Sequence, residues 1–197
     1  MKYEQAVAVA RDVVERLAPW CERIEIAGSI RRKKRAPKDV EIVFWPQQVA
    51  SSATLFDVHK VPATDRVIAD LIDEGFWTFD QEVKRNGPRY KRLIHTASGA
   101  VIELFRADAE NWGYIYALRT GPGDFNKMIV SRQWQGGVLP LEVKVEHGYV
   151  YRRGVRVPVP DEATFFDLWE LPFIPPEERS AAKLRRLVGV RARATRR

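Results

Sequence analysis

Two short apolar runs that carry acidic residues constrain the fold of this chain more than any other feature. DVEIVFW at residues 39–45 and AVIELFR at residues 100–106 are rich in β-branched and aromatic residues, which predicts two β-strands. Successive side chains of a strand point to opposite faces. In the first strand the apolar residues would therefore share one face, while Asp39 and Glu41 share the other. We expect helices to cover the apolar face.

The segments around these strands predict a mixed fold. Residues 4–18 and 64–75 repeat their apolar residues at helical spacing, so we expect an amphipathic helix in each. Further short strands are predicted at residues 23–27, 77–83 and 89–95. Residues 46–63 predict an irregular connection. We therefore expect the α+β class, with a mixed β-sheet and helices on one of its faces.

The character of the sequence changes near residue 108, which predicts a domain boundary there. Beyond it, TGPG at residues 120–123 separates two helical segments, and short strand-like segments precede a capped helix at residues 161–170. We expect three parts, namely a domain at residues 1–108, a smaller mixed α/β lobe at residues 109–180 and a basic tail at residues 181–197.

Composition excludes several classes of protein. The chain has 197 residues, of which 45% are hydrophobic, enough to bury a core without disulfides. Its single cysteine, Cys21, excludes an internal disulfide, and its three histidines lie far apart, without the spacing of a zinc site. No run approaches the ~18 apolar residues that span a membrane, and the charged N-terminal segment predicts no secretory signal. We expect a cytoplasmic monomer with no membrane partner.

The positive charge is concentrated in two segments. Residues 179–197 contain eight Lys and Arg residues and no acid, so the rest of the chain has a net charge of −1 although the whole chain has +7. A second cluster, RRKKR at residues 31–35, is followed closely by Lys38. Either segment can neutralise the phosphates of a nucleic acid. The alternative for the first is a solvated tail that aids solubility.

Glu103, in the middle of the second apolar run, suggests a shared acidic site. If the two strands pair in an antiparallel sheet, Asp39, Glu41 and Glu103 meet on one surface. Neighbouring carboxylates repel each other unless a cation lies between them, and oxygen ligands suit Mg²⁺. Such a set can hold two Mg²⁺ ions, or Mn²⁺, about 3.5–4 Å apart for phosphoryl transfer. The alternative is that Asp39 and Glu41 are ordinary solvent-facing acids.

Gly28 and Ser29 directly follow the strand predicted at residues 23–27. A glycine there lets the backbone approach a phosphate, and the N–H groups of the turn, with the serine hydroxyl, can bind its oxygens. Arg31 and Arg32 come next and supply positive charge. Taken alone, the Gly-Ser pair is equally consistent with a plain β-turn.

Four segments, in this order, resemble the family X DNA polymerases, the polymerase β-like nucleotidyltransferases. GSIRRKKRAPKDVEIVF is similar to the family's Gly-Ser-x-Arg-Arg motif followed by an acid-hydrophobic-acid strand. VIELF resembles the strand of the third catalytic carboxylate, ALRTGPGDFNKMI the Thr-Gly-x-x-x-x-Asn segment, and TFFDLWELPFIPPEER the C-terminal signature. The four segments cover about residues 1–180. The resemblance implies a nucleotidyltransferase palm at residues 1–108 and a thumb-like lobe after it.

The resemblance also implies roles for particular residues. Asp39, Glu41 and Glu103 would be the catalytic carboxylates and the ligands of two Mg²⁺ ions, with Glu103 facing the primer 3′-OH. The residues implied to bind the nucleotide are Gly28, Ser29 and Arg32 at its phosphates, Gly121 at its sugar, Asn126 at its base edge, and also Lys38. The residues implied to contact DNA are Lys127, Arg119, Arg132, Arg185 and Arg186.

The chain departs from the family pattern in three respects. Two of its three catalytic acids are glutamates where the family usually has aspartates, and Leu118-Arg119 replaces the aromatic pair before Thr-Gly. The first helix is predicted to begin almost at Met1, so we expect no N-terminal lyase domain and no deoxyribose-phosphate lyase activity. In its place, we expect the basic tail to act as a clamp on DNA.

The function implied by the resemblance is that of a DNA-directed DNA polymerase. It would use nucleoside triphosphates and a DNA primer-template or gapped DNA, and extend the primer 3′-OH by two-metal nucleotidyl transfer in short-gap filling or repair. Two alternatives stay open. One is a nucleotidyltransferase that extends ends without a template or modifies a small molecule, and the other is a non-catalytic DNA-binding palm.

Overall fold

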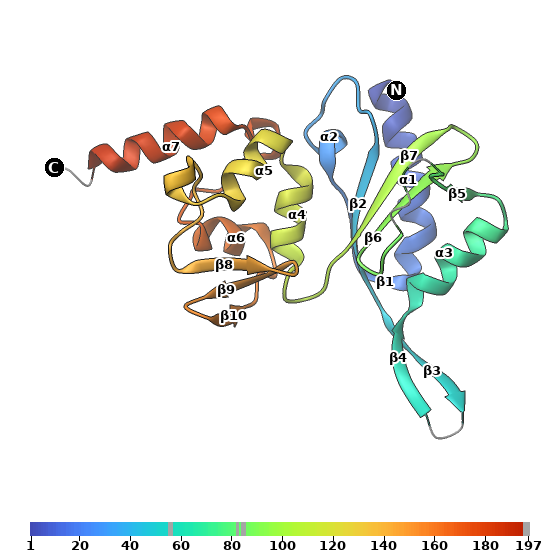
Figure 1. Cartoon of the computed structure of the whole chain (residues 1–197). Coiled ribbons are helices and arrows are strands. Elements are labelled where there is room, and N and C mark those ends of the chain that lie inside the picture. Colours follow the sequence, from blue (N-terminus) through green and yellow to red (C-terminus); the bar gives the residue numbers. More distant parts are fainter. Residues whose placement is uncertain (55–56, 82, 84–85, 195–197) are drawn as a thin grey trace. The chain divides into compact units, whose positions relative to one another are not determined.

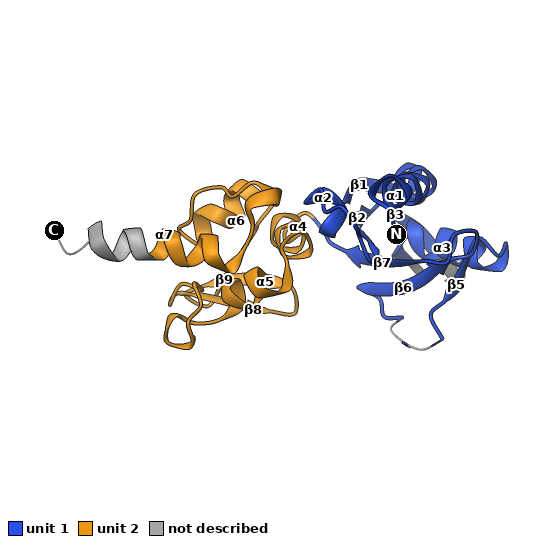
Figure 2. Cartoon of the chain, turned by 90° about the horizontal axis from the view of Figure 1, so that it is seen from above, with its two compact units in different colours: residues 1–108 blue, residues 109–197 orange. Residues whose placement is uncertain are grey.

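The structure, a computed structural model, describes residues 1–54, 57–81, 83 and 86–194. The chain divides into two compact units, Met1–Asp108 and Ala109–Arg197, shown in blue and orange in Figure 2. Residues 195–197, the end of the expected basic tail, lie outside the described residues. Each unit is described by itself below.

Unit 1 combines helices with a five-stranded sheet and a separate hairpin (Figure 1). Its helices are α1 (Tyr3–Leu17), the 3₁₀ turn η1 (Ala18–Trp20), α2 (Gly28–Arg31) and α3 (Ala63–Asp73). Its strands are β1 (Cys21–Ile26), β2 (Val40–Pro46), β3 (Gln48–Thr54), β4 (Asp57–Pro62), β5 (Trp77–Phe79), β6 (Tyr90–His95) and β7 (Ala100–Arg106).

The five-stranded sheet has the order β1-β2-β7-β6-β5 and is mixed. β2 and β7 are neighbours, as expected, but they run parallel, and the other pairs in this sheet are antiparallel. The antiparallel pairing that the sequence analysis took as its condition for a shared acidic site is therefore not the one formed. The reason is topological: helix α3 and four strands, β3 to β6, lie between β2 and β7 in the chain, and this long crossover connection returns β7 in the direction of β2.

The core of unit 1 lies on one face of this sheet. The apolar side chains of β2 predicted to share a face, Val40, Ile42 and Phe44, are at most 2% exposed and belong to one hydrophobic cluster. Residues of α1 and α3 belong to the same cluster, so both helices cover this face. A mixed α/β fold, compatible with the expected α+β class, is the result. The acids of the strands are left on the opposite face.

Residues 46–63, expected to be an irregular connection, contain the two-stranded hairpin β3–β4. QVASSAT in β3 is rich in small and polar residues and gives little strand signal. The pairing with β4 supplies backbone hydrogen bonds that local propensity does not reveal. The hairpin forms a sheet of its own, apart from the one that carries the acids.

Unit 2 has its own core and a small sheet of order β10-β9-β8. Its helices are α4 (Trp112–Thr120), α5 (Gly123–Val130), η2 (Gln133–Gln135), α6 (Glu162–Leu168), η3 (Pro176–Glu178) and α7 (Ala181–Ala194). Its strands are β8 (Val143–Glu146), β9 (Tyr149–Arg152) and β10 (Val155–Val157). As predicted, α6 is capped: the Asp161 carboxylate accepts a hydrogen bond from the Thr164 N–H at 2.7 Å.

The segment expected to be a basic tail is largely helical. Residues Ala181–Ala194 form α7, and Leu184 is fully buried in the core of unit 2. Arg179, counted with the tail charges, is also buried, and its guanidinium donates to the Glu162 carboxylate at 2.7 Å and to the Ile174 carbonyl at 3.0 Å. The apolar residues interspersed with the arginines explain this difference, because they attach the helix to the core.

No helix in the described part of the chain is both long and apolar enough to cross a membrane.

Candidate functional site

A row of charged residues crosses three strands of the large sheet. Glu41 of β2 and Glu103 of β7 are direct partners in the parallel register, and Glu103 is in turn the partner of Arg92 on β6. Register partners place their side chains on the same face of a sheet. The structure thus brings together two of the three predicted acids, on the face opposite the core.

The Glu103 carboxylate is held by two donors from β6. The Tyr90 hydroxyl donates to Glu103 Oε1 at 2.6 Å, and Arg92 Nη1 donates to the same oxygen at 2.8 Å. The Tyr90 ring stacks on Phe105, with 5.0 Å between ring centroids, which fixes the direction of its hydroxyl. Burial and the hydrogen bond to Glu103 raise the pKa of Tyr90 to about 12, so the phenol remains a donor.

Arg92 also contacts a fourth acid. Its Nε donates to Asp80 Oδ2 at 2.7 Å, and the side chains of Arg92, Asp80 and Glu103 are only 23%, 10% and 17% exposed. The hydrogen bond to Asp80, together with that to Glu103, raises the pKa of Arg92 further, so the guanidinium stays charged.

Sequence analysis did not identify Tyr90, Arg92 or Asp80. Tyr90 and Arg92 are two residues apart in the strand that pairs with residues 100–106, so the alternation of side chains was a usable signal. The register that pairs Tyr90 with Phe105 and Arg92 with Glu103 could not be predicted from the sequence.

Asp39 lies just before β2 and is electrostatically coupled to this row. Burial raises the pKa of Asp39, and the negative charge of Glu103 raises it further, whereas the positive charges of Arg92 and Arg32 lower it. A carboxyl group responds in this way when other charges are close. The structure therefore places Asp39 within the electrostatic reach of Glu103, and Arg32 within that of Asp39.

Gly28, which Ser29 follows, lies beside the second acid, Glu41. A Cβ atom at Gly28 would be 1.9 Å from Glu41 Oε2, so the absence of a side chain lets the Glu41 carboxylate rest against the backbone. Gly28 also has a positive φ of 62°, which favours glycine. Among the described residues the Ser29 hydroxyl has no hydrogen-bond partner although it is shielded from solvent. An oxygen of this kind is suited to a ligand that supplies the missing hydrogen bond.

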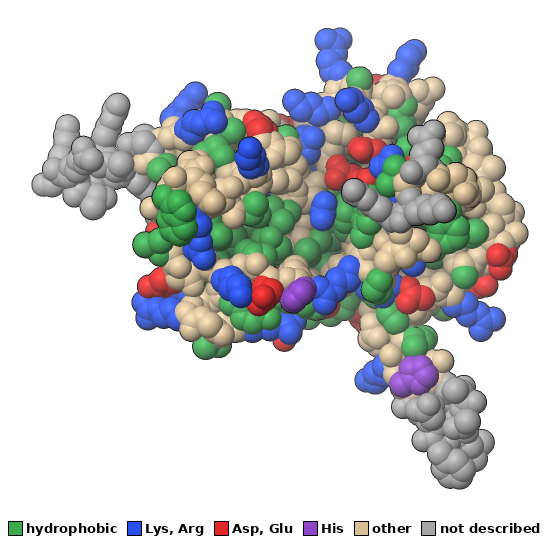
Figure 3. Space-filling view, viewed as in Figure 1, with side chains coloured by type: hydrophobic (Ala, Val, Ile, Leu, Met, Phe, Trp, Pro, Cys, Tyr) green, Lys and Arg blue, Asp and Glu red, His purple; other side chains and the backbone are tan. Residues whose placement is uncertain are grey.

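The basic cluster begins at Arg31, the last residue of α2. Figure 3 shows Lys and Arg side chains gathered over the top of unit 1, above a group of acidic side chains. The exposed members of the cluster are Lys33, Lys34, Arg35 and Lys38, whereas Arg31 and Arg32 are half-buried. Positive and negative side chains therefore lie near one another in this part of unit 1.

The three acids have the ligand chemistry that a divalent cation prefers, because all of them are carboxylates. Glu41 and Glu103 share a sheet face and Asp39 is coupled electrostatically to Glu103, and repulsion between such neighbouring carboxylates favours a bound cation. In the described part of the chain, however, no three carboxylate, imidazole or thiol groups are grouped so as to hold one ion. Glu41 rests against Gly28, and Glu103 is engaged by Tyr90 and Arg92.

In unit 2, Gly121 ends α4 and Asn126 lies in α5, the next helix. The Asn126 amide nitrogen donates to the carbonyls of Leu118 at 2.6 Å and Gly121 at 3.0 Å. A Cβ atom at Gly121 would be 2.2 Å from Asn126 Oδ1, so only glycine fits beneath the amide. Asn126 thus stabilises the connection between the two helices, and its implied role at a base edge stays a prediction.

The residues implied to contact DNA differ in their surroundings. Lys127 and Arg119 are exposed on α5 and α4. Arg132 is half-buried instead, and its Nη1 donates to the carbonyls of Pro140 at 2.6 Å and Leu141 at 3.2 Å, so it ties a loop together.

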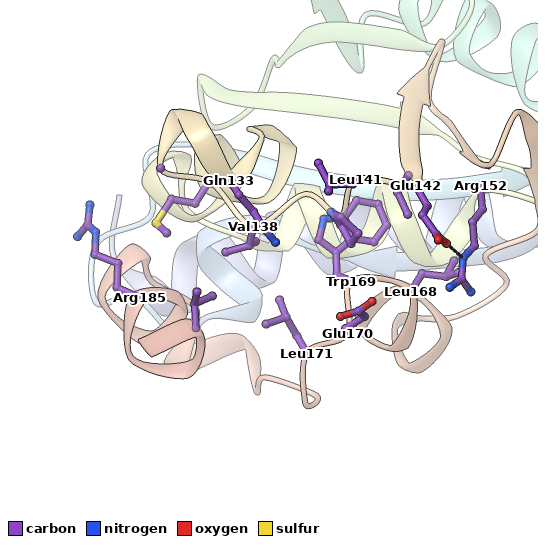
Figure 4. A pocket seen from close by; sticks show the side chains of 16 residues that line it. Gln133, Val138, Leu141, Glu142, Arg152, Leu168, Trp169, Glu170, Leu171 and Arg185 are labelled. Atoms are coloured by element: carbon purple, nitrogen blue, oxygen red, sulfur yellow. Dashed lines mark hydrogen bonds and ion pairs between the residues drawn. The ribbon is translucent and has the colours of Figure 1, made fainter. Parts of the chain in front are cut away.

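Arg185 and Arg186 are exposed on α7. Arg185 also lines a hollow of about 800 Å³ in unit 2, together with apolar side chains such as Val138, Leu171 and Trp169 (Figure 4). None of the acids of the sheet lines this hollow.

Comparison with models of known protein families gives no match, and no curated protein matches the sequence significantly.

Proposed function

We propose that this chain is a nucleotidyltransferase of the family X DNA polymerase type, which extends the 3′-OH of a DNA primer in short-gap filling or repair. One arrangement carries the proposal: Glu41 and Glu103 are register partners on one sheet face, with Asp39 coupled to Glu103. The Gly28-Ser29 turn and a basic cluster adjoin them.

Asp39, Glu41 and Glu103 would hold two Mg²⁺ ions, for which Mn²⁺ is a substitute. When bound, these ions neutralise the charge of the triphosphate and of the oxygens between which the phosphoryl group is transferred. The three acids come from β2, β7 and the loop before β2. Together they would supply oxygen ligands without a continuous metal-binding motif in the sequence.

The residues beside the acids would orient the nucleotide. The Ser29 hydroxyl and the Arg32 guanidinium would bind oxygens of the β- and γ-phosphates, and Gly28 would let the backbone come close to them. Lys38 adds positive charge at the edge of the site. Positioning of this kind, with charge neutralisation, accounts for most of the catalysis of phosphoryl transfer.

The reaction would proceed by in-line displacement. The 3′ oxygen of the primer forms a bond to the α-phosphorus of the nucleotide, and pyrophosphate leaves with the electrons of the broken bond. A carboxylate facing the 3′-OH helps to accept its proton, the role assigned to Glu103. Lys and Arg side chains would bind the phosphates of DNA, so the affinity for DNA should fall steeply with salt.

A primer-extension assay tests this proposal. The full chain is incubated with a labelled primer, alone, annealed to a template, or in a one-nucleotide gap, with nucleoside triphosphates and either Mg²⁺ or EDTA. We expect extension that requires Mg²⁺ and whose first nucleotide is complementary to the template.

The other outcomes separate the alternatives. Extension of the primer alone, with no template preference, would identify a template-independent enzyme. Binding of DNA without incorporation under any metal would contradict catalysis and leave a DNA-binding protein.

A further inference from the structure

The hydrogen bonds on Glu103 are unevenly distributed between its two oxygens. Tyr90 and Arg92 both donate to Oε1, at 2.6 and 2.8 Å. In the part of the chain that the structure describes, no hydrogen bond is made to Oε2. The carboxylate is therefore fixed in orientation by one oxygen, while the other keeps its lone pairs.

Both donors are themselves held in place. The Tyr90 ring is stacked on Phe105, and Phe105 is the register partner of Tyr90. Arg92 uses Nε to bind Asp80 and Nη1 to bind Glu103, so its rigid planar group spans two acids. A guanidinium bonded to two acids has less freedom to move, so Arg92 fixes the position of the Glu103 carboxylate.

We infer that Tyr90 and Arg92, anchored by Phe105 and Asp80, form a clamp that fixes Glu103 by Oε1 and presents Oε2 to a divalent cation. Both are positioning residues, because they act through Glu103. The expected effect of this clamp on nucleotide incorporation rests on the proposed function. Its consequence for cation binding depends only on the geometry of the three side chains.

Arg92 has a second effect, on charge. Its guanidinium lies against Glu103 and lowers the pKa of Asp39, so it partly neutralises the acidic face. Because like charges repel, the same guanidinium opposes the arrival of a cation. Arg92 therefore keeps the acids together before the cation binds, at the expense of cation affinity.

These two effects give a signature that a merely structural residue would not produce. Arg92→Gln removes the positive charge, so Mn²⁺ binding should tighten by at least about threefold. It also removes the guanidinium that contacts both Asp80 and Glu103, so kcat should fall by about 10²-fold, the size of effect caused by a misplaced catalytic group. Arg92→Lys keeps the charge but cannot span both acids, so Mn²⁺ affinity should stay within about twofold, and kcat should still fall.

Tyr90→Phe isolates the hydroxyl. It keeps the ring on Phe105 and removes only the hydrogen bond to Glu103. We expect a lower kcat, by about 10-fold or more, with an unchanged KM for the nucleotide. Lys91→Gln is the matched control: Lys91 lies between the two residues in β6, points to the other face and contacts Asn86, and its substitution should change neither quantity.

The experiment titrates Mn²⁺ by electron paramagnetic resonance into the wild type and the variants, with Asp39→Asn defining the signal that belongs to the acidic face. Thermal unfolding identifies variants that fail to fold, in which case Arg92→Lys and Tyr90→Phe carry the test, and primer extension gives kcat and KM. Tighter Mn²⁺ binding by Arg92→Gln with a lower kcat supports the clamp. Unchanged or weaker Mn²⁺ binding by folded Arg92→Gln, or unchanged kcat in Tyr90→Phe, overturns it.

The failure of the two proposals can be told apart. If the wild type incorporates no nucleotide, the proposed function fails, and the Mn²⁺ titration alone decides on the clamp. Tightening in Arg92→Gln but not in Lys91→Gln then supports the clamp, and equal affinities in the two variants overturn it.

Discussion

At the scale of single residues, Gly28 is the point where the backbone comes closest to the acids. Its φ of 62° lies in the left-handed region, and a Cβ atom there would collide with Glu41 Oε2 at 1.9 Å. The glycine thus has two separable functions. It permits the turn after β1, and it leaves room for a carboxylate of the site.

The substitution Gly28→Ala should therefore impair both stability and activity. The left-handed conformation costs an alanine roughly 1–2 kcal/mol, which lowers the free energy of unfolding measured in urea. Displacement of the Glu41 carboxylate should in addition lower the rate of nucleotide incorporation by about 10²-fold.

Gly75→Ala separates the two effects. Gly75 has a similar φ of 75°, but a Cβ atom there would meet nothing within 4 Å. We expect a similar loss of stability with unchanged incorporation. Equal rates in the two variants would show that the space above Gly28 does not matter to the site.

At the scale of elements, α7 combines packing with charge. Leu184 is buried in the core of unit 2, whereas Arg185 and Arg186 are exposed on the same helix. Removing the whole segment would expose that core, so deletion cannot distinguish a DNA contact from a loss of folding. Arg179, two residues before α7, is buried in an ion pair with Glu162 and has a structural role.

Substitution of both exposed arginines, Arg185→Gln with Arg186→Gln, tests whether α7 contacts DNA. Because each phosphate contact releases counterions, the slope of log affinity against log salt should become shallower by about 2. Fluorescence anisotropy with a labelled primer-template at several salt concentrations measures the slope, and thermal unfolding should be unchanged.

The double variant Arg66→Gln with Lys144→Gln is the control, because it alters the net charge by the same amount at exposed residues of other elements. If both double variants weaken DNA binding equally, the effect is one of net charge, and α7 is not a contact.

At the scale of the whole molecule, the features that could be predicted from the sequence are those determined by residues within one segment. The strands of the acids and helix α1 follow from alternation or helical spacing within one segment, and they were predicted. The parallel direction of β7 depends on the connection that precedes it. The β3–β4 hairpin depends on pairing between two weakly patterned segments. Neither feature was predicted from the sequence.

The same distinction holds for the site. Asp39, Glu41 and Glu103 stand out because each is an acid in or beside an apolar strand, and the register sets two of them side by side. Alternation along β6 indicates that Tyr90 and Arg92 share a face. Only the register of β6 against β7 and the fold of the segment after β5, however, bring these two residues and Asp80 to Glu103.

The central claim is that these acids catalyse nucleotidyl transfer together. The most direct test is the single-turnover rate of nucleotide incorporation, at saturating Mg²⁺, for Asp39→Asn and for Glu22→Gln, an exposed acid on β1 of the same sheet. We predict that Asp39→Asn lowers the rate by at least about 10²–10³-fold, as the loss of a group that stabilises transition-state charge does, while Glu22→Gln matches the wild type. Equal rates for Asp39→Asn and the wild type would contradict the account.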